Sequence, residues 1–161
     1  MKRLFHGLAI AVAMATLIGM LPACDDDNNP AGGGPTTGTV SGTVTFNGTW
    51  PTTGDVQISV FSTFPPPPGP PDAFTDPIPA AASYDYQIGG LEPGDYAAIV
   101  VGWRDPANPS TAEILGMYWA FVDSVAVDSN GNPRGFPLPV TVEAGQTEEN
   151  LDITADLDVA P

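Results

Sequence analysis

The stretch YDYQIGGLEPGDYAAIVVGW, residues 84–103, contains two different β-strand patterns on either side of one turn. In its first part, Tyr84, Tyr86 and Ile88 alternate with polar residues, which is typical of a strand with one buried and one solvated face. The second part, residues 96–103, is apolar at both odd and even positions and predicts a central strand covered on both sides. The Pro93-Gly94 pair between them predicts a tight turn. This stretch alone therefore indicates an all-β domain.

The same alternation continues along most of the chain and is repeatedly interrupted by turn residues. Turn pairs occur at Asn47-Gly48, Asn130-Gly131 and Ala144-Gly145. The short strands that we expect, besides the two above, cover residues 40–46, 56–60, 114–121, 125–127, 140–142 and 151–158. No helical periodicity occurs after the N-terminal segment. The pattern predicts an antiparallel Greek-key β-sandwich of about seven strands over residues 39–161.

The N-terminal segment ends in the lipobox Leu21-Pro22-Ala23-Cys24, which follows Lys2, Arg3 and an apolar run. A basic start, an apolar core and small residues before a cut site define a secretory signal peptide. A membrane-spanning helix is the alternative, but the many Ala and Gly residues and the acidic residues that follow favour cleavage. We therefore expect residues 1–23 to be removed and Cys24 to carry the lipid of a bacterial lipoprotein.

Residues 24–38 then form an acidic, Gly- and Pro-rich segment that we interpret as a disordered tether. As a flexible coil it reaches roughly 20 Å. The acidic run after Cys24 resembles the surface-export signal of Bacteroidetes lipoproteins and favours the outer membrane or cell surface. Under the enterobacterial sorting rule, Asp25 instead indicates the periplasmic face of the inner membrane.

Cleavage would also change the chemistry of the chain, because Lys2, Arg3 and His6 leave with the signal peptide. The remaining chain has 19 carboxylates against Arg104 and Arg134, for a net charge of −17. This charge excludes nucleic acid as a partner, since affinity for phosphates comes from Lys and Arg. Without His, Lys or a free thiol, the usual general bases and nucleophiles are missing. We expect no catalysis and no cofactor; a hydrolase built on two carboxylates is the least favoured alternative.

Three segments carry a resemblance to a known family: VSGTV at 40–44, GLEPGDY at 90–96, and VTVEAGQT at 140–147 followed by LDI at 151–153. In this order and spacing they resemble the carboxypeptidase regulatory-like domain, a transthyretin-like β-sandwich. The resemblance implies a structural or binding module without catalytic residues, which needs a separate partner. We expect this partner to be an envelope protein or a polysaccharide. Independently, the turn at Pro93-Gly94 would let Tyr96 tie its hydroxyl to nearby backbone, as in a tyrosine corner.

The tryptophans are the candidate ligand-binding residues of the domain. Exposed rings of Trp50, Trp103 and Trp119, with Arg104 beside them, would suit stacking on a carbohydrate. The alternative, which we favour, is that Trp50 and Trp103 cover the open ends of the core. Arg104 is then expected to pair with local carboxylates or to stack on Trp103.

Two loops carry weaker signals. Asp128, Asn130 and Asn132 place oxygen atoms at alternate positions, as in the beginning of a calcium loop, but a hairpin turn explains the same residues. The run FPPPPGPP at 64–71 has to be extended; it could dock in an aromatic groove, and we favour a stiff loop between two strands.

Overall fold

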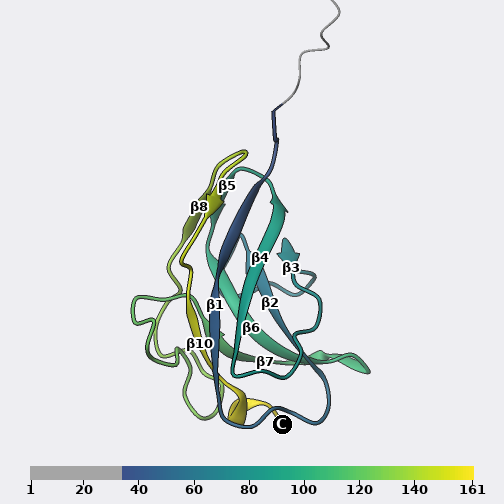
Figure 1. The fold of residues 1–161 in the computed structure, drawn as a ribbon. Coiled ribbons are helices and arrows are strands. Elements are labelled where there is room, and N and C mark those ends of the chain that lie inside the picture. Colours follow the sequence, from purple (N-terminus) through teal and green to yellow (C-terminus); the bar gives the residue numbers. More distant parts are fainter. Residues whose placement is uncertain (1–33) are drawn as a thin grey trace, which may run out of the picture. The chain divides into compact units, whose positions relative to one another are not determined.

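Ten β-strands and one turn of 3-10 helix form the part of the chain that the computed structural model describes, residues 34–161 (Figure 1). The expected signal peptide, Cys24 and most of the expected tether lie outside these residues. The all-β class is confirmed, and no helix in residues 34–161 has the length and apolarity needed to cross a membrane. The elements are β1 (Gly38–Asn47), β2 (Asp55–Phe61), β3 (Ala73–Phe74), β4 (Ser83–Leu91), β5 (Gly94–Tyr96), β6 (Ala98–Asp105), β7 (Asn108–Met117), β8 (Val140–Val142), β9 (Thr147–Glu148), β10 (Ile153–Asp156) and η1 (Leu157–Val159).

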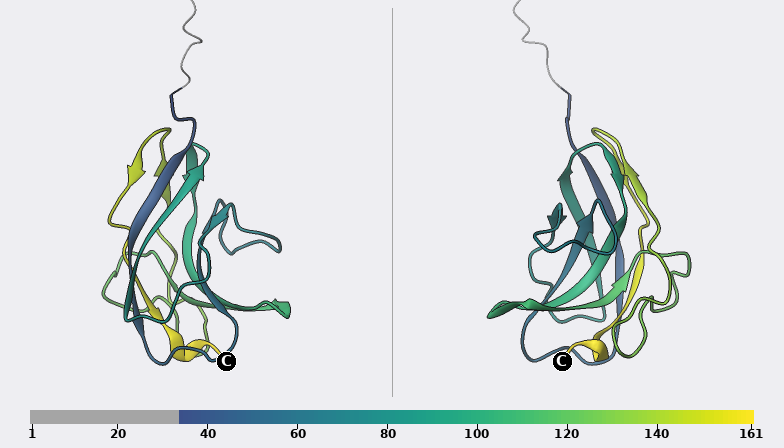
Figure 2. Two further views of the ribbon diagram at one scale, coloured as in Figure 1. Left: turned by 45° about the vertical axis from the view of Figure 1, so that its right-hand side comes forward. Right: turned by 180° about the vertical axis from the view of Figure 1, so that it is seen from behind.

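The strands form two four-stranded sheets and one pair. One sheet has the order β10–β1–β4, with β9 also paired to β1; the other has the order β3–β2–β6–β7; β5 pairs with β8. Figure 2 shows the two larger sheets facing each other. The expectation of purely antiparallel pairing is wrong at β1, which pairs in parallel with both β9 and β10. The strands number ten rather than about seven, because several elements are only two or three residues long.

The main core lies between the two large sheets. Val40 and Val44 of β1 are fully buried there against residues such as Ile58 of β2 and Val101 of β6. Their alternate neighbours face outward, as the period of two requires. Burial of these branched side chains is the main stabilising contribution to such a domain, about 1.5–3 kcal/mol for each fully buried side chain.

β6 is the central strand expected from the apolar run at 96–103, but it begins at Ala98, and Tyr96 belongs instead to β5. β6 lies between β2 and β7 and buries residues on both of its faces. Ile99 and Val101 belong to the main core, whereas Ala98 and Val100 form a second cluster with Met117 and Ala126. The expected two-sided burial is confirmed, because the long segment between β7 and β8 covers the outer face of this sheet.

Several strand boundaries differ from the sequence-based expectation. β7 ends at Met117, so residues 118–121 belong to the loop that follows. Residues 125–127 form no strand; only one isolated bridge joins Val127 to Pro133. At the C-terminus the alternation continues to residue 158, but Asp156 accepts a hydrogen bond from the Asp158 backbone N–H at 3.1 Å and turns the chain into η1. A local side-chain cap overrides the strand pattern there.

The expected tyrosine corner is confirmed. The Tyr96 hydroxyl donates a 2.9 Å hydrogen bond to the Glu92 carbonyl, across the turn at Pro93-Gly94. Because β4 and β5 belong to different sheets, this bond fixes the chain where it crosses from one layer to the next. The turn at Asn47-Gly48 is likewise a crossing between sheets rather than a hairpin, with Gly48 at a φ of 86°.

β9 and β10 together follow the edge of β1 as one interrupted strand. Val40 is opposite Glu148 and Val44 is opposite Ile153, so the β9–β10 side contains one extra residue. Across the interruption, the Leu151 N–H donates to the Ser41 carbonyl at 3.1 Å. An extra residue of this kind bends a strand and re-aims its side chains.

Candidate functional site

Trp103 lies in the core of the domain. Its side chain is 3% exposed, and its indole N–H donates to the Thr53 carbonyl at 2.7 Å. A ligand cannot stack on a ring that is covered on both sides. The proposal that Trp103 belongs to an exposed binding face is therefore wrong, and its burial against the core corresponds to the interpretation favoured above.

Trp50 is half-buried and closes the same core. Its ring centroid lies 4.9 Å from that of Phe46, and its indole N–H donates to the Ala81 carbonyl at 2.9 Å. The ring of Trp50 thus packs within the domain, and its indole N–H already has a hydrogen-bond acceptor there.

Trp119 lies on a different part of the domain, against the second cluster on the outer side of β6 and β7. Its indole N–H donates to the Ser124 carbonyl at 2.9 Å, and its ring contacts Phe121 edge-on at 5.2 Å. The three tryptophans therefore do not form one face. Of the three, only Trp119 has an exposed aromatic neighbour.

The connection between β7 and β8, residues 118–139, carries most of the exposed apolar side chains of the described domain. We call it the aromatic loop. Phe136 is 84% exposed and Phe121 is 64% exposed, and Val122 and Leu138 are also exposed. Phe136 was not among the predicted site residues; in the sequence it is a large apolar residue between Gly135 and Pro137, in a stretch too short for a strand.

The aromatic loop is tied to the sheets by hydrogen bonds. The Thr154 hydroxyl of β10 donates to the Val122 carbonyl at 2.6 Å, and the Leu138 N–H donates to the Tyr118 carbonyl at 2.9 Å. The Ser124 N–H closes a turn on the Phe121 carbonyl at 3.0 Å. These bonds hold the backbone on both sides of the exposed rings. The positions at which Phe121 and Phe136 leave the backbone are therefore fixed.

Arg104 is exposed at the end of β6. In the sheet register it lies opposite Asp55 of β2, next to the buried Trp103. A carboxylate thus lies across the strand pair from this cation, the arrangement in which opposite charges support a sheet.

The Asp128–Asn132 segment forms a closed turn. The carboxylate of Asp128 accepts hydrogen bonds from the Asn130 N–H at 2.8 Å and the Asn132 N–H at 3.0 Å. These backbone bonds hold the pKa of the Asp128 carboxyl below its usual value. The oxygen that a calcium ion would need is already directed at two amide donors. No cluster of three or more His, Cys, Asp or Glu side chains suited to a metal occurs within residues 34–161.

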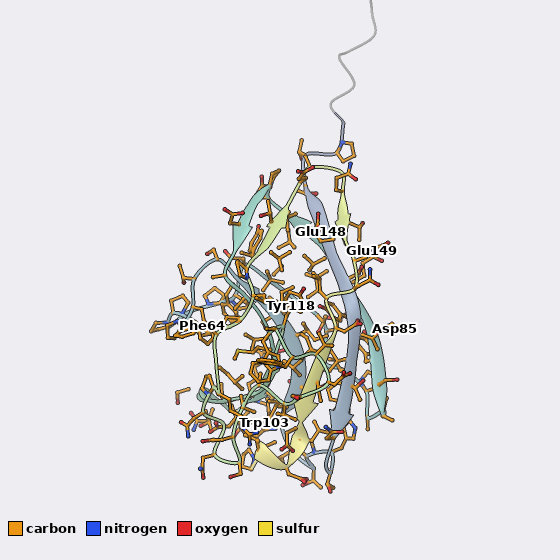
Figure 3. The ribbon with its side chains drawn as sticks, turned by 90° about the vertical axis from the view of Figure 1, so that its left-hand side faces the viewer. Phe64, Asp85, Trp103, Tyr118, Glu148 and Glu149 are labelled. Atoms are coloured by element: carbon orange, nitrogen blue, oxygen red, sulfur yellow. The ribbon has the colours of Figure 1, made fainter. Side chains whose placement is uncertain are left out.

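The proline-rich run at 64–71 is the loop that joins β2 to β3, two antiparallel neighbours (Figure 2). The Asp72 N–H donates to the Val60 carbonyl at 3.0 Å and closes this loop. Phe64 packs against the second cluster, on the opposite side of the domain from Asp85 in Figure 3.

An acidic depression lies beside the β9–β10 interruption. It is open to solvent, has a volume of about 280 Å³, and is lined by residues 41–43 of β1, Asp85 and Tyr86 of β4, and residues 149, 150 and 152. The Thr43 hydroxyl donates to Asp85 Oδ1 at 2.8 Å, and the Thr43 N–H donates to Asp152 Oδ1 at 2.8 Å. Figure 3 shows Asp85, Glu148 and Glu149 on the same side of the domain. This side is therefore hydrophilic and negatively charged.

Comparison of the chain with family models, with curated proteins and with solved structures finds no match.

Proposed function

We propose that this chain is a lipid-anchored, non-catalytic β-domain of the bacterial cell envelope that acts as a protein-interaction module. The anchor is the lipid on Cys24, after cleavage of residues 1–23, and residues 24–38 tether the domain to the outer membrane or cell surface. The fold assignment that accompanies this proposal is a Greek-key, transthyretin-like sandwich. It is supported by the tyrosine corner between Tyr96 and Glu92 and by two large sheets around one core.

The observation that carries the interaction role is the exposure of Phe121 and Phe136 on the aromatic loop. Four of the five large apolar side chains exposed in residues 34–161 belong to this loop, and exposed apolar surface marks sites of interaction with a partner. The hydrogen bonds from Thr154 and Trp119 order the loop before binding, which lowers the entropic cost of association. Aromatic residues of this kind supply most of the affinity at protein interfaces.

In vivo photo-crosslinking tests this role and offers a matched control within the chain. A photoreactive phenylalanine analogue at Phe136 should form a covalent adduct with an envelope protein. The same analogue at Phe74, which is 54% exposed on β3, should not. Serine substitution at Phe121 should weaken the adduct at position 136. Equal adducts at positions 74 and 136, or none at 136, would rule out the aromatic loop as the interface.

The anchor is tested separately by Cys24→Ser. This substitution should abolish the incorporation of labelled fatty acid into the chain, because Cys24 is the proposed attachment site. Continued labelling after the substitution would contradict lipidation at this position.

A carbohydrate-binding surface lipoprotein is the second candidate function. It is favoured by the pair Trp119–Phe121, whose edge-on contact leaves Phe121 exposed for stacking on a sugar ring. Saturable binding on a glycan array that Phe121→Ala abolishes would support this alternative over protein docking.

A further inference from the structure

β4 is an edge strand of its sheet. It is the last strand in the order β10–β1–β4 and extends over nine residues, Ser83–Leu91. Among the strands of residues 34–161, it pairs with β1 alone. Figure 1 shows β3 near β4, but β3 pairs with β2 in the other sheet.

The hydrogen bonds of β1 determine which backbone groups of β4 face outward. The Ser41 carbonyl and the Thr43 N–H bond to the segment at 151–152, on the side of β1 away from β4. Backbone groups alternate sides along a strand, so the residues of β1 that bond to β4 are the even-numbered ones, including Gly42. The Phe46 N–H, which donates to the Ala82 carbonyl at 3.0 Å, follows the same alternation.

In the β1–β4 register, these even-numbered residues lie opposite Tyr84, Tyr86 and Ile88. The intervening residues of β4 therefore direct their N–H and C=O groups away from the sheet. Asp85, Gln87 and Gly89 are these residues, and all three are exposed. None of the three forms a backbone bond to another segment within residues 34–161. Together they present a row of free donors and acceptors in strand geometry.

The corresponding edge of the other sheet is covered. The carbonyls of Val56 and Ile58 on β2 accept hydrogen bonds from the backbone N–H groups of Ile78 and Thr75, at 2.8 and 2.9 Å. The Thr75 hydroxyl also accepts from the Ile58 N–H at 3.1 Å. The segment after β3 thus protects β2 from strand addition, whereas no comparable segment bonds to β4 among the described residues.

Apart from one register shift at its end, where Thr39 is opposite Gly89 and Gly38 is opposite Leu91, β4 lacks the features that usually protect an edge strand. Such strands are commonly short, bulged, or marked by Pro or Lys. The sequence SYDYQIGGL has neither Pro nor Lys, and its register with β1 is regular from Thr39 to Thr45. Its single charge, Asp85, is held by the Thr43 hydroxyl.

The charge around this edge indicates which strand could be added. Asp85 lines the acidic depression together with Glu149 and Asp152. Residues 34–161 contain 16 carboxylates and only two arginines, so a second copy of the chain would bring like charges together. A segment rich in Lys or Arg would instead be attracted to this side of the domain.

We propose that the β4 edge binds an extended, basic segment of a partner protein by β-strand addition. Main-chain hydrogen bonds to Asp85, Gln87 and Gly89 supply affinity, and basic side chains of the added strand face the carboxylates of the depression. This proposal names the partner chemistry for the proposed interaction role and rests on that role, but it uses a surface other than the aromatic loop.

Hydrogen exchange of the full chain tests the edge directly. The probe is a decapeptide of alternating lysine and valine. In the free chain, the amides of Asp85, Gln87 and Gly89 should exchange quickly, whereas those of Tyr86 and Ile88 should exchange slowly. Saturating peptide should slow the first three amides about tenfold or more, since each gains a ladder hydrogen bond. A peptide with glutamate in place of lysine should give no protection.

Two substitutions at position 87 separate the contribution of the backbone N–H to peptide binding from that of the side chain. Gln87→Pro removes an outward N–H without breaking a bond to β1, which is the placement that proline tolerates on an edge strand. It should weaken peptide binding about five- to tenfold, whereas Gln87→Thr, which keeps the N–H, should bind as the unmodified chain does. Thermal melting of both variants verifies that they fold.

Three results would overturn strand addition at β4: slow exchange of Asp85, Gln87 and Gly89 in the free chain, absence of peptide protection at these amides, or unchanged binding by a folded Gln87→Pro. If Gln87→Pro does not fold, the proposal is tested by hydrogen exchange of the unmodified chain, with and without peptide. Crosslinking at Phe136 reports on the aromatic loop and does not depend on this edge, so the two proposals fail separately.

Discussion

The hydroxyl of Tyr86 donates a 2.6 Å hydrogen bond to the backbone carbonyl of Leu151. Tyr86 lies on β4 opposite Gly42 of β1, and Leu151 lies in the interruption between β9 and β10. A Cβ atom at position 42 would collide with the same Leu151 carbonyl. A glycine and a buried tyrosine on neighbouring strands therefore make room for the irregular segment and satisfy its polar group.

Tyr86→Phe should destabilise the domain by about 1–3 kcal/mol, because the Leu151 carbonyl would lose its donor in the interior. Urea unfolding of the full chain measures this change. Tyr84→Phe, on the same strand and half-buried, is the matched control and should change the free energy of unfolding by less than about 0.5 kcal/mol. Equal losses in the two variants would mean that the Tyr86 hydroxyl contributes nothing specific.

Alkaline pH should also destabilise the domain through Tyr86. Burial, and secondarily the nearby Asp152 carboxylate, raises the pKa of Tyr86 well above the usual tyrosine value of 10.0. The stabilising contribution is complete below pH 10 and is lost as the pH rises above it, because the unfolded chain then releases the phenolic proton first. The free energy of unfolding should fall by up to about 1.4 kcal/mol per pH unit for this one group.

The measurement is a series of unfolding curves between pH 9 and 11. Tyr86→Phe should show a shallower decline over this interval than the unmodified chain. Parallel pH profiles for the two proteins would contradict the assignment to Tyr86.

Gly116→Ala should disrupt the contact between β7 and β10. A Cβ atom at this position would lie 2.6 Å from the Thr154 carbonyl oxygen and 3.0 Å from the Ala155 Cα, and backbone cannot rotate away as a side chain can. We expect a loss of about 1–3 kcal/mol or more, typical of overpacking. At Gly102 of the adjacent strand β6, the nearest atom would be 3.5 Å away, so Gly102→Ala should be tolerated. Thermal melting of both variants provides the comparison.

The Asp128 turn should behave as a self-contained element rather than a calcium site. Hydrogen bonds from the backbone of Asn130, then of Asn132, lower the pKa of the Asp128 carboxyl below the usual aspartate value of 3.8. NMR titration should therefore show Asp128 titrating below the usual range of an aspartate, and millimolar calcium should leave both its signals and the melting temperature unchanged. A calcium-dependent rise in melting temperature would instead reveal a bound ion, since binding to the folded state must stabilise it.

Of the candidate sites, the sequence predicted Trp50 and Trp103 better as core than as ligand-binding residues. The burial of Trp103 follows from its position at the end of the strand that is apolar on both faces. The exposed Phe136 could not be predicted in this way, because a loop residue has no periodicity that relates it to a core. The open edge of β4 was equally inaccessible, since alternation shows which face of a strand is buried but not which strand ends the sheet.

The sequence by itself determined the all-β class, the tyrosine corner, the central position of β6 and the strongly acidic character of the domain. Each of these depends on local features: alternation with a period of two, the chemistry of turn residues, and composition. Only the tertiary structure decided that β1 pairs in parallel with β9 and β10, that Trp103 is covered, and that β4 is left open. These properties depend on which segments meet in space, and the contacts between strands far apart in the sequence leave no mark on the periodicity of either strand.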